Sequence, residues 1–183
     1  MQLTDAERAH RHRIFGAFLR HAPDTAPDNR TLFERLHHLD QAQALDPVPG
    51  QNAELALLNF EAARRAEQAG ALATARRYLQ QGRNLARQTD AAELRQPTFE
   101  TGLRLARLES TNGRHDIAAE ILNESAGLAR DPASRSALTL AWNQLLLQRG
   151  RPQEALDRLC SGLAEHGVEI PGNRPPRRRW RWR

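Results

Sequence analysis

Three glycines that share one local pattern constrain the fold of this 183-residue chain more than any other feature of its sequence. Each is followed by an alanine after five residues, a leucine after nine and a small residue after twelve. The three sets are Gly70, Ala75, Leu79 and Gly82; Gly113, Ala118, Leu122 and Ser125; and Gly150, Ala155, Leu159 and Gly162. Glycine permits a tight turn between two helices, alanine allows close helix approach, and leucine fills the space between helix pairs. The pattern therefore predicts repeated helical hairpins.

The residues before the turns extend this repeat. Ala63 and Ala106 lie seven residues before their glycines, where a small side chain eases the same helix crossing. The third repeat has Asn143 at that position instead. The pattern resembles tetratricopeptide (TPR) repeats, although the glycine spacings of 43 and 37 residues exceed the TPR period of about 34. We therefore expect lengthened loops between repeats.

The composition supports an all-α fold. Alanine, leucine, arginine, glutamate and glutamine dominate, and these residues lose little side-chain freedom in a helix. Thr4 with Glu7 and Thr31 with Glu34 have the spacing of a capping box, which predicts a helix start at each threonine. Pro152 stands where a proline in the first turn of a helix is tolerated.

We therefore predict an all-α, TPR-like stack of about four antiparallel helical hairpins, an α-solenoid, over residues 1–171. An N-terminal hairpin is expected over 1–45, followed by repeats over 51–89, 97–130 and 134–167. A disordered tail rich in arginine and tryptophan is expected over 172–183.

A narrower resemblance covers most of residues 7–171. It is carried by the pair His38–Leu39, by Leu58, Asn59 and Ala62, by the turn Ala69–Gly70–Ala71, and by Tyr78–Leu79. These residues resemble the helical region that follows the ATPase domain in large bacterial signalling proteins, which join a serine/threonine kinase, an AAA-type ATPase and a sensor histidine kinase. The resemblance implies a linker role in signal transduction. The catalytic parts of that family are absent from this sequence, which has no glycine-rich phosphate loop and no lysine.

The candidate binding residues lie before each turn. In a TPR stack the first helix of each pair lines a concave groove, and Arg64, Arg107 and Gln144 lie six residues before their glycines. Phe60, Leu103 and Leu140 lie ten residues before the same glycines and are expected to face the same groove. The two arginines beside apolar positions would suit an acidic or C-terminal peptide. Solvated arginines on an empty groove are the alternative.

The high isoelectric point belongs to the C-terminus. All 27 basic residues are arginines, and six of them lie in the last ten positions, which leaves 21 against 22 acidic residues in the rest of the chain. Arginine and tryptophan alternate in this tail, as suits contact with nucleic acid or an anionic membrane surface. The tail candidates are Arg177, Arg178, Arg179, Trp180, Arg181 and Trp182. The alternatives are an end with no role and a segment translated out of frame.

No motif predicts catalysis, a cofactor or a metal. His10 with His12 and His37 with His38 lack the three- or four-residue spacing that places two ligands on one helix face. Cys160 lies in an apolar helical pattern and is expected to be inert.

We expect a non-enzymatic protein-interaction module, with a nucleic-acid or anionic-surface binder acting through its tail as the alternative. Its partners would be a protein or peptide segment, with self-association through an uncovered C-terminal end. Met1 to Arg20 give no signal peptide and no stretch is apolar enough to span a bilayer, so we expect a cytoplasmic protein. The abrupt change of composition near Pro171 also fits a severed piece of a longer gene.

Overall fold

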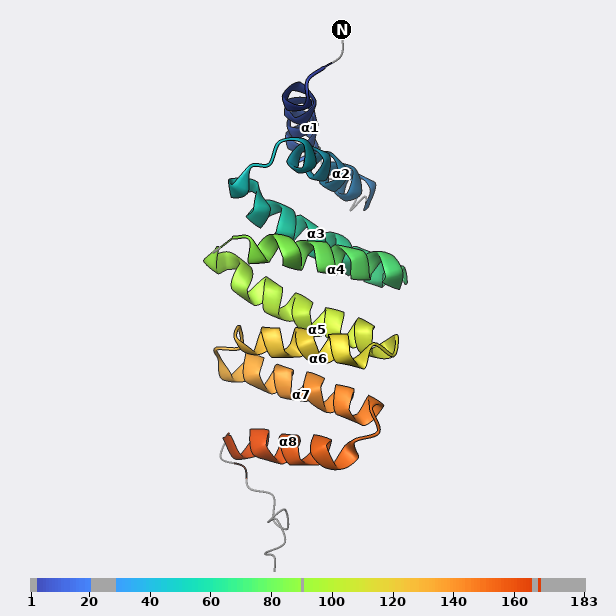
Figure 1. The fold of residues 1–183 in the computed structure, drawn as a ribbon, viewed down its shortest axis with the longest axis vertical. Helices are drawn as coiled ribbons and strands as arrows, with labels where there is room; N and C mark the ends of the chain where they lie inside the picture. Colours follow the sequence, from blue (N-terminus) through green and yellow to red (C-terminus); the bar gives the residue numbers. More distant parts are fainter. Residues whose placement is uncertain (1–2, 21–28, 90, 166–167, 169–183) are drawn as a thin grey trace, which may run out of the picture. The chain divides into compact units, whose positions relative to one another are not determined.

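The computed structural model of the chain describes residues 3–20, 29–89, 91–165 and 168, and all regular structure in these ranges is helical (Figure 1). The prediction of an all-α protein is confirmed for these residues. In chain order the helices are α1 (Asp5–Arg20), α2 (Asn29–Leu45), η1 (Pro49–Gln51), α3 (Asn52–Gln68), α4 (Leu72–Arg87), η2 (Ala92–Leu94), α5 (Arg95–Thr111), α6 (His115–Ala126), α7 (Pro132–Gln148) and α8 (Pro152–Glu165). The two η elements are short 3₁₀ helices.

The helices pack against their neighbours in the chain, within two compact units. The first unit, Met1–Leu108, contains the pairs α1 with α2 and α3 with α4. The second unit, Glu109–Arg183, contains α7 packed on both α6 and α8. The boundary between the units falls inside α5, and so within the segment 97–130 for which the sequence predicts one repeat.

The three landmark glycines form the same turn between consecutive helices. Gly70, Gly113 and Gly150 have φ angles of 73°, 75° and 69°, and they are the glycines of positive φ in the part of the chain that the structure describes. At each turn the glycine N–H donates three residues back and the next N–H donates five residues back, over N–O distances of 2.8–3.0 Å. This is the Schellman pattern that ends helices at a left-handed residue. The turn prediction is therefore confirmed at all three sites.

The positions after the turns pack as their sizes predict. Ala75 and Ala118 are completely buried, and Ala155 is 2% exposed. Gly82 lets α4 approach α3 closely, because a Cβ atom there would lie 2.6 Å from Cε1 of Phe60. Small residues at these positions thus set the distance between the two helices of a hairpin.

The helix starts follow the sequence in part. Thr4 and Glu7 form the predicted capping box, with Thr4 N–H donating to Glu7 Oε2 at 2.8 Å and Glu7 N–H to Thr4 Oγ1 at 3.2 Å. The second predicted box is wrong, because α2 begins before Thr31 and Glu34 instead accepts from Nε of Arg30 at 2.7 Å.

None of the helices that the structure describes has the length and apolar character needed to cross a membrane.

Candidate interaction surface

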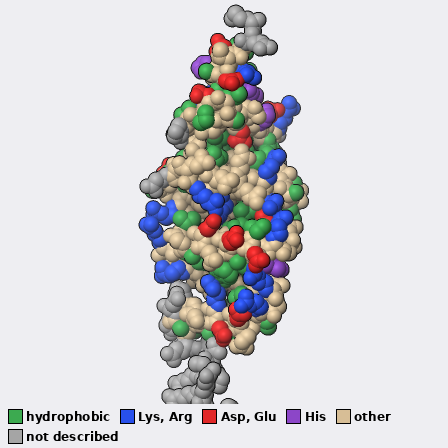
Figure 2. All heavy atoms as spheres, in the orientation of Figure 1, with side chains coloured by type: hydrophobic (Ala, Val, Ile, Leu, Met, Phe, Trp, Pro, Cys, Tyr) green, Lys and Arg blue, Asp and Glu red, His purple; other side chains and the backbone are tan. Residues whose placement is uncertain are grey.

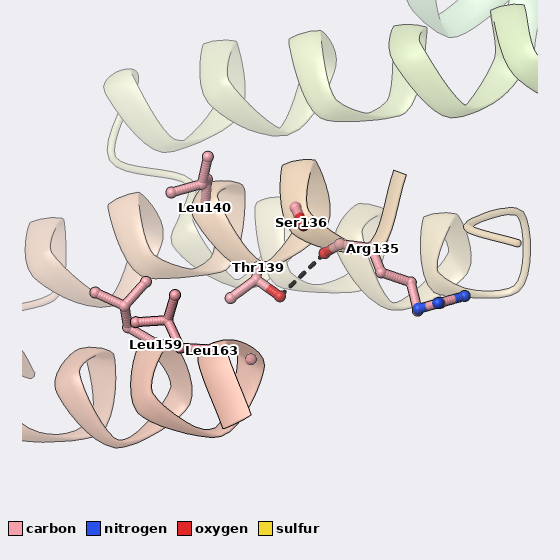
Figure 3. A pocket seen from close by; sticks show the side chains of 7 residues that line it. Arg135, Ser136, Thr139, Leu140, Leu159 and Leu163 are labelled. Atoms are coloured by element: carbon pink, nitrogen blue, oxygen red, sulfur yellow. Dashed lines mark hydrogen bonds between the residues drawn. The ribbon is translucent and has the colours of Figure 1, made fainter. Parts of the chain in front are cut away.

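An apolar hollow lies between α7 and α8, within the second unit. It has a volume of about 230 Å³ and is partly open to solvent. Its lining residues are Arg135, Ser136, Thr139, Leu140, Leu159, Gly162 and Leu163. Figure 3 shows Leu159 and Leu163 on α8 with their side chains toward α7, and Thr139 on α7 facing them.

The hollow is apolar because the hydroxyl group of Thr139 makes its hydrogen bond within its own helix. Thr139 Oγ1 donates to the backbone oxygen of Arg135 at 3.0 Å, so that its hydroxyl is bonded within α7. Gly162 contributes no side chain, and a Cβ atom there would lie 3.0 Å from the Thr139 methyl carbon. The inner surface therefore consists mainly of the leucine side chains.

The rim of the hollow carries one exposed leucine and one cation. Leu140 is a lining residue that is 56% exposed, although its side chain is large and apolar, and Figure 3 shows this side chain pointing away from α8. Arg135 is also exposed and donates from Nη1 to the backbone oxygen of Arg130 at 2.9 Å. Since a guanidinium has five N–H donors, Arg135 keeps donors for a further acceptor.

Of the two predicted groove residues in the second unit, Leu140 and Gln144, only Leu140 lines the hollow. Leu140 lines the hollow, whereas Gln144, one turn further along α7, is exposed and does not line it. The sequence did not indicate Arg135, Thr139 or Leu163 as lining residues. The sequence indicates Gly162 as a packing residue, and this small residue, which faces Thr139, is the signal that points to the hollow.

The remaining four groove candidates lie in the first unit. Leu103 is half-buried and Arg107 exposed on α5. Phe60 is only 8% exposed and belongs to a core cluster with Ala56 and Leu94. Its assignment to an open groove is wrong, because the Phe60 ring packs against Gly82, which has no side chain, and is buried there.

Arg64 is exposed, and its side chain is held by a neighbouring carboxylate. Its Nε and Nη2 atoms donate to Glu61 at 2.8 and 2.6 Å. The hydrogen bond from Arg64 is the largest cause that lowers the pKa of Glu61 to about 2, and Arg65 adds to it. An acidic ligand at Arg64 would have to compete with Glu61.

Two of the histidines meet across helices. His12 on α1 and His38 on α2 have their Nδ1 atoms 2.9 Å apart. Burial lowers the pKa of His38, and the nearby His12 and His37 lower it further. Within the described ranges no group of three or more histidine, cysteine or acidic side chains is placed to hold a metal ion.

The charged side chains of the described helices carry both signs. Figure 2 shows arginine and acidic side chains lying near one another on the face that it draws. The tail candidates Arg177, Arg178, Arg179, Trp180, Arg181 and Trp182 lie outside the described residues.

Compared with family models, curated proteins and solved structures, the chain has no match. The resemblances to TPR repeats and to bacterial signalling proteins thus remain predictions from its own residues.

Proposed function

We propose that this chain is a non-catalytic, TPR-like interaction module that binds a segment of another protein through the hollow between α7 and α8. The observation that carries the proposal is the 56% exposure of Leu140, one of the residues that line an apolar hollow. Exposed apolar surface of this kind, rimmed by polar residues, is typical of interaction sites. The hollow is smaller than the roughly 300–1,000 Å³ usual for small-molecule pockets, which favours one side chain of a protein partner as its occupant.

The chemistry of the rim defines the partner more closely. A leucine, isoleucine or methionine of the partner would contact Leu159 and Leu163, and an acidic residue beside it would accept from Arg135. Such a segment, apolar with a neighbouring acid, is the ligand that we propose. In a longer relative the same module would transmit conformational state between an ATPase and a kinase domain, and we place it in the cytoplasm.

The experiment is a pull-down from native cell extract with matched variants of α7. Leu140→Gln removes the apolar rim, and Leu147→Gln is its control, because Leu147 is equally exposed at 56% on the same helix but does not line the hollow. A protein retained by wild type and by Leu147→Gln, but not by Leu140→Gln, supports the proposal. Loss with Arg64→Ala or Arg107→Ala alone would instead assign binding to the first unit.

The alternative function, binding of nucleic acid or an anionic surface, rests on the alternating arginine and tryptophan residues of the tail. A chain ending at Pro171 separates the two functions in the same pull-down. Nucleic acid held only by the full chain, and released steeply as salt rises, would favour the tail. A protein held by both chains at physiological salt would favour the helices.

A further inference from the structure

A second cluster of functional side chains lies in the first unit, where α1 and α2 bring His12 and His38 together. The two Nδ1 atoms are 2.9 Å apart, although the residues are 26 positions apart in the sequence. The ring centroids are 5.2 Å apart and the ring planes are tilted by 40°. At this distance one nitrogen must carry a hydrogen and the other must present a lone pair. The two rings therefore share one proton between two nitrogens from different helices.

The surroundings hold one ring in place and leave both within reach of solvent. Phe15 stacks on the ring of His38 with centroids 5.3 Å apart and planes 23° from parallel. His12 and His38 are both partly exposed, so an ion could reach the facing nitrogens without unfolding the hairpin. The pair is thus both positioned and accessible.

The two nitrogens lie slightly closer together than two ligands on one tetrahedral metal ion. Imidazole nitrogens bind zinc at about 2.0–2.1 Å, so two of them are about 3.3 Å apart at the tetrahedral angle. A small rotation of the two rings would open the present separation of 2.9 Å to that distance. Imidazole is a preferred ligand of zinc, nickel and copper. We propose that His12 and His38 form a two-histidine site for a divalent transition-metal ion, which would replace the shared proton.

The number of protein ligands determines how the ion would be coordinated and which helices it would link. The structure offers two protein ligands from two helices, so water would complete the coordination. An ion bound in this way links α1 to α2 and stabilises the folded hairpin by mass action. The site goes beyond the proposed function, because it lies in the other unit and needs no protein partner.

The test uses the full, untagged chain and three metal salts: zinc sulfate, nickel chloride and copper chloride. Calorimetric titration should show one ion per chain for at least one metal, and the melting temperature should rise with that metal. In ¹H–¹⁵N spectra of the imidazoles, the signals of His12 and His38 should shift. His12→Ala and His38→Ala should each weaken binding by at least about tenfold. His10→Ala is the matched control, since His10 is exposed on the same helix, and it should bind as wild type does.

Two results would overturn the proposal. One is the absence of heat and of chemical-shift change with all three metals. The other is unchanged affinity in the double variant His12→Ala/His38→Ala. His38→Gln guards against a folding artefact, because the amide keeps a hydrogen-bonding group at this position but is a poor metal ligand. Helix content measured by circular dichroism shows whether each variant is folded, and loss of binding counts only in folded variants.

Discussion

Arg114 donates from its Nε atom to the carboxylate of Glu109, a side chain that is 0% exposed. The same two residues close the helix turn at Gly113, where Arg114 N–H donates to the backbone oxygen of Glu109 at 2.9 Å. In the turn at Gly70 the corresponding residues are Ala66 and Ala71, whose backbones form the same hydrogen bond and whose side chains carry no charge. The second turn thus has an ion pair that includes a buried carboxylate where the first turn has two alanines.

Arg114→Ala is expected to lower the free energy of unfolding by about 1–3 kcal/mol, because it removes a charged partner from a buried group. The double variant Glu109→Leu/Arg114→Ala should be more stable than this single variant, since leucine occupies the same position, as Leu146, in the third turn. Urea denaturation monitored by circular dichroism measures both. Arg107→Ala, an exposed arginine on α5, is the control and should change stability by less than about 0.5 kcal/mol. An equal loss in the control would show that the ion pair contributes nothing.

Replacing a turn glycine should cost stability through the backbone alone. No heavy atom lies within 4 Å of a Cβ built on Gly70, whose φ is 73°. Gly70→Ala should therefore destabilise by about 1–2 kcal/mol, the cost of the left-handed conformation for a residue with a Cβ atom. Gly127→Ala is the control, since Gly127 has a φ of −64° and should accept alanine without loss. Equal denaturation midpoints for the two variants would contradict this account.

Gly82→Ala should destabilise for a different reason, namely steric overlap. Its Cβ would lie 2.6 Å from Cε1 of Phe60 and 3.0 Å from Cβ of Asn59, and overpacking of this kind costs about 1–3 kcal/mol. Phe60→Leu, which removes the far part of the ring, should recover part of the loss in the double variant. Thermal melts of the two single variants and the double variant measure this coupling, and strictly additive effects would argue against contact as the cause.

The features that the sequence predicted well depend on local geometry. Two such features are the positive φ angle at the three turn glycines and the capping box of Thr4 and Glu7. Each depends only on residues a few positions apart in the sequence. The predicted cap at Thr31 failed because its spacing to Glu34 also occurs inside a helix, where Arg30 pairs with Glu34.

The features that the sequence missed depend on tertiary packing. A groove position for Phe60 follows from helical spacing, but its burial depends on Gly82 of the next helix. The contact of His12 with His38 joins two helices, so spacing within one helix could not predict it. The hollow between α7 and α8 likewise forms because Thr139 and Gly162 face each other across two helices, which the spacing within one helix does not predict.

Glu61 makes part of the stability depend on pH. Its pKa is lowered from 4.5 to about 2, chiefly by the hydrogen bond from Arg64, so the folded state binds a proton less readily than the unfolded state. The resulting stabilisation is fully present above pH 4.5 and is lost as the pH falls toward 2. Arg64→Ala should raise the pKa of Glu61 toward 4.5, as measured by the carboxyl ¹³C shift against pH. An unchanged pKa in this variant would show that Arg64 is not the main cause.

The last described helix, α8, leaves apolar side chains partly uncovered. At the ninth position after the turn glycine, Leu79 is 0% and Leu122 1% exposed, whereas Leu159 is only partly buried. The helix that carries Leu122, α6, is followed by α7, which packs on it. No helix within the described residues follows α8, and Leu156 on it is 47% exposed.

We expect a second copy of the chain to cover the face of α8 that carries Leu156, which does not line the hollow, because association removes apolar side chains from water. Sedimentation velocity over a wide range of protein concentration should show a dimer whose fraction rises with concentration. Leu156→Gln should weaken the dimer, while Leu72→Gln, at a leucine of the first unit with a similar exposed fraction (51%), should leave it unchanged. Maleimide cross-linking through the partly buried Cys160, which lies four residues after Leu156 on α8, would give a second readout. A chain that remains monomeric at the highest concentration would rule out this interface and would mean that the exposed leucines are simply tolerated in water.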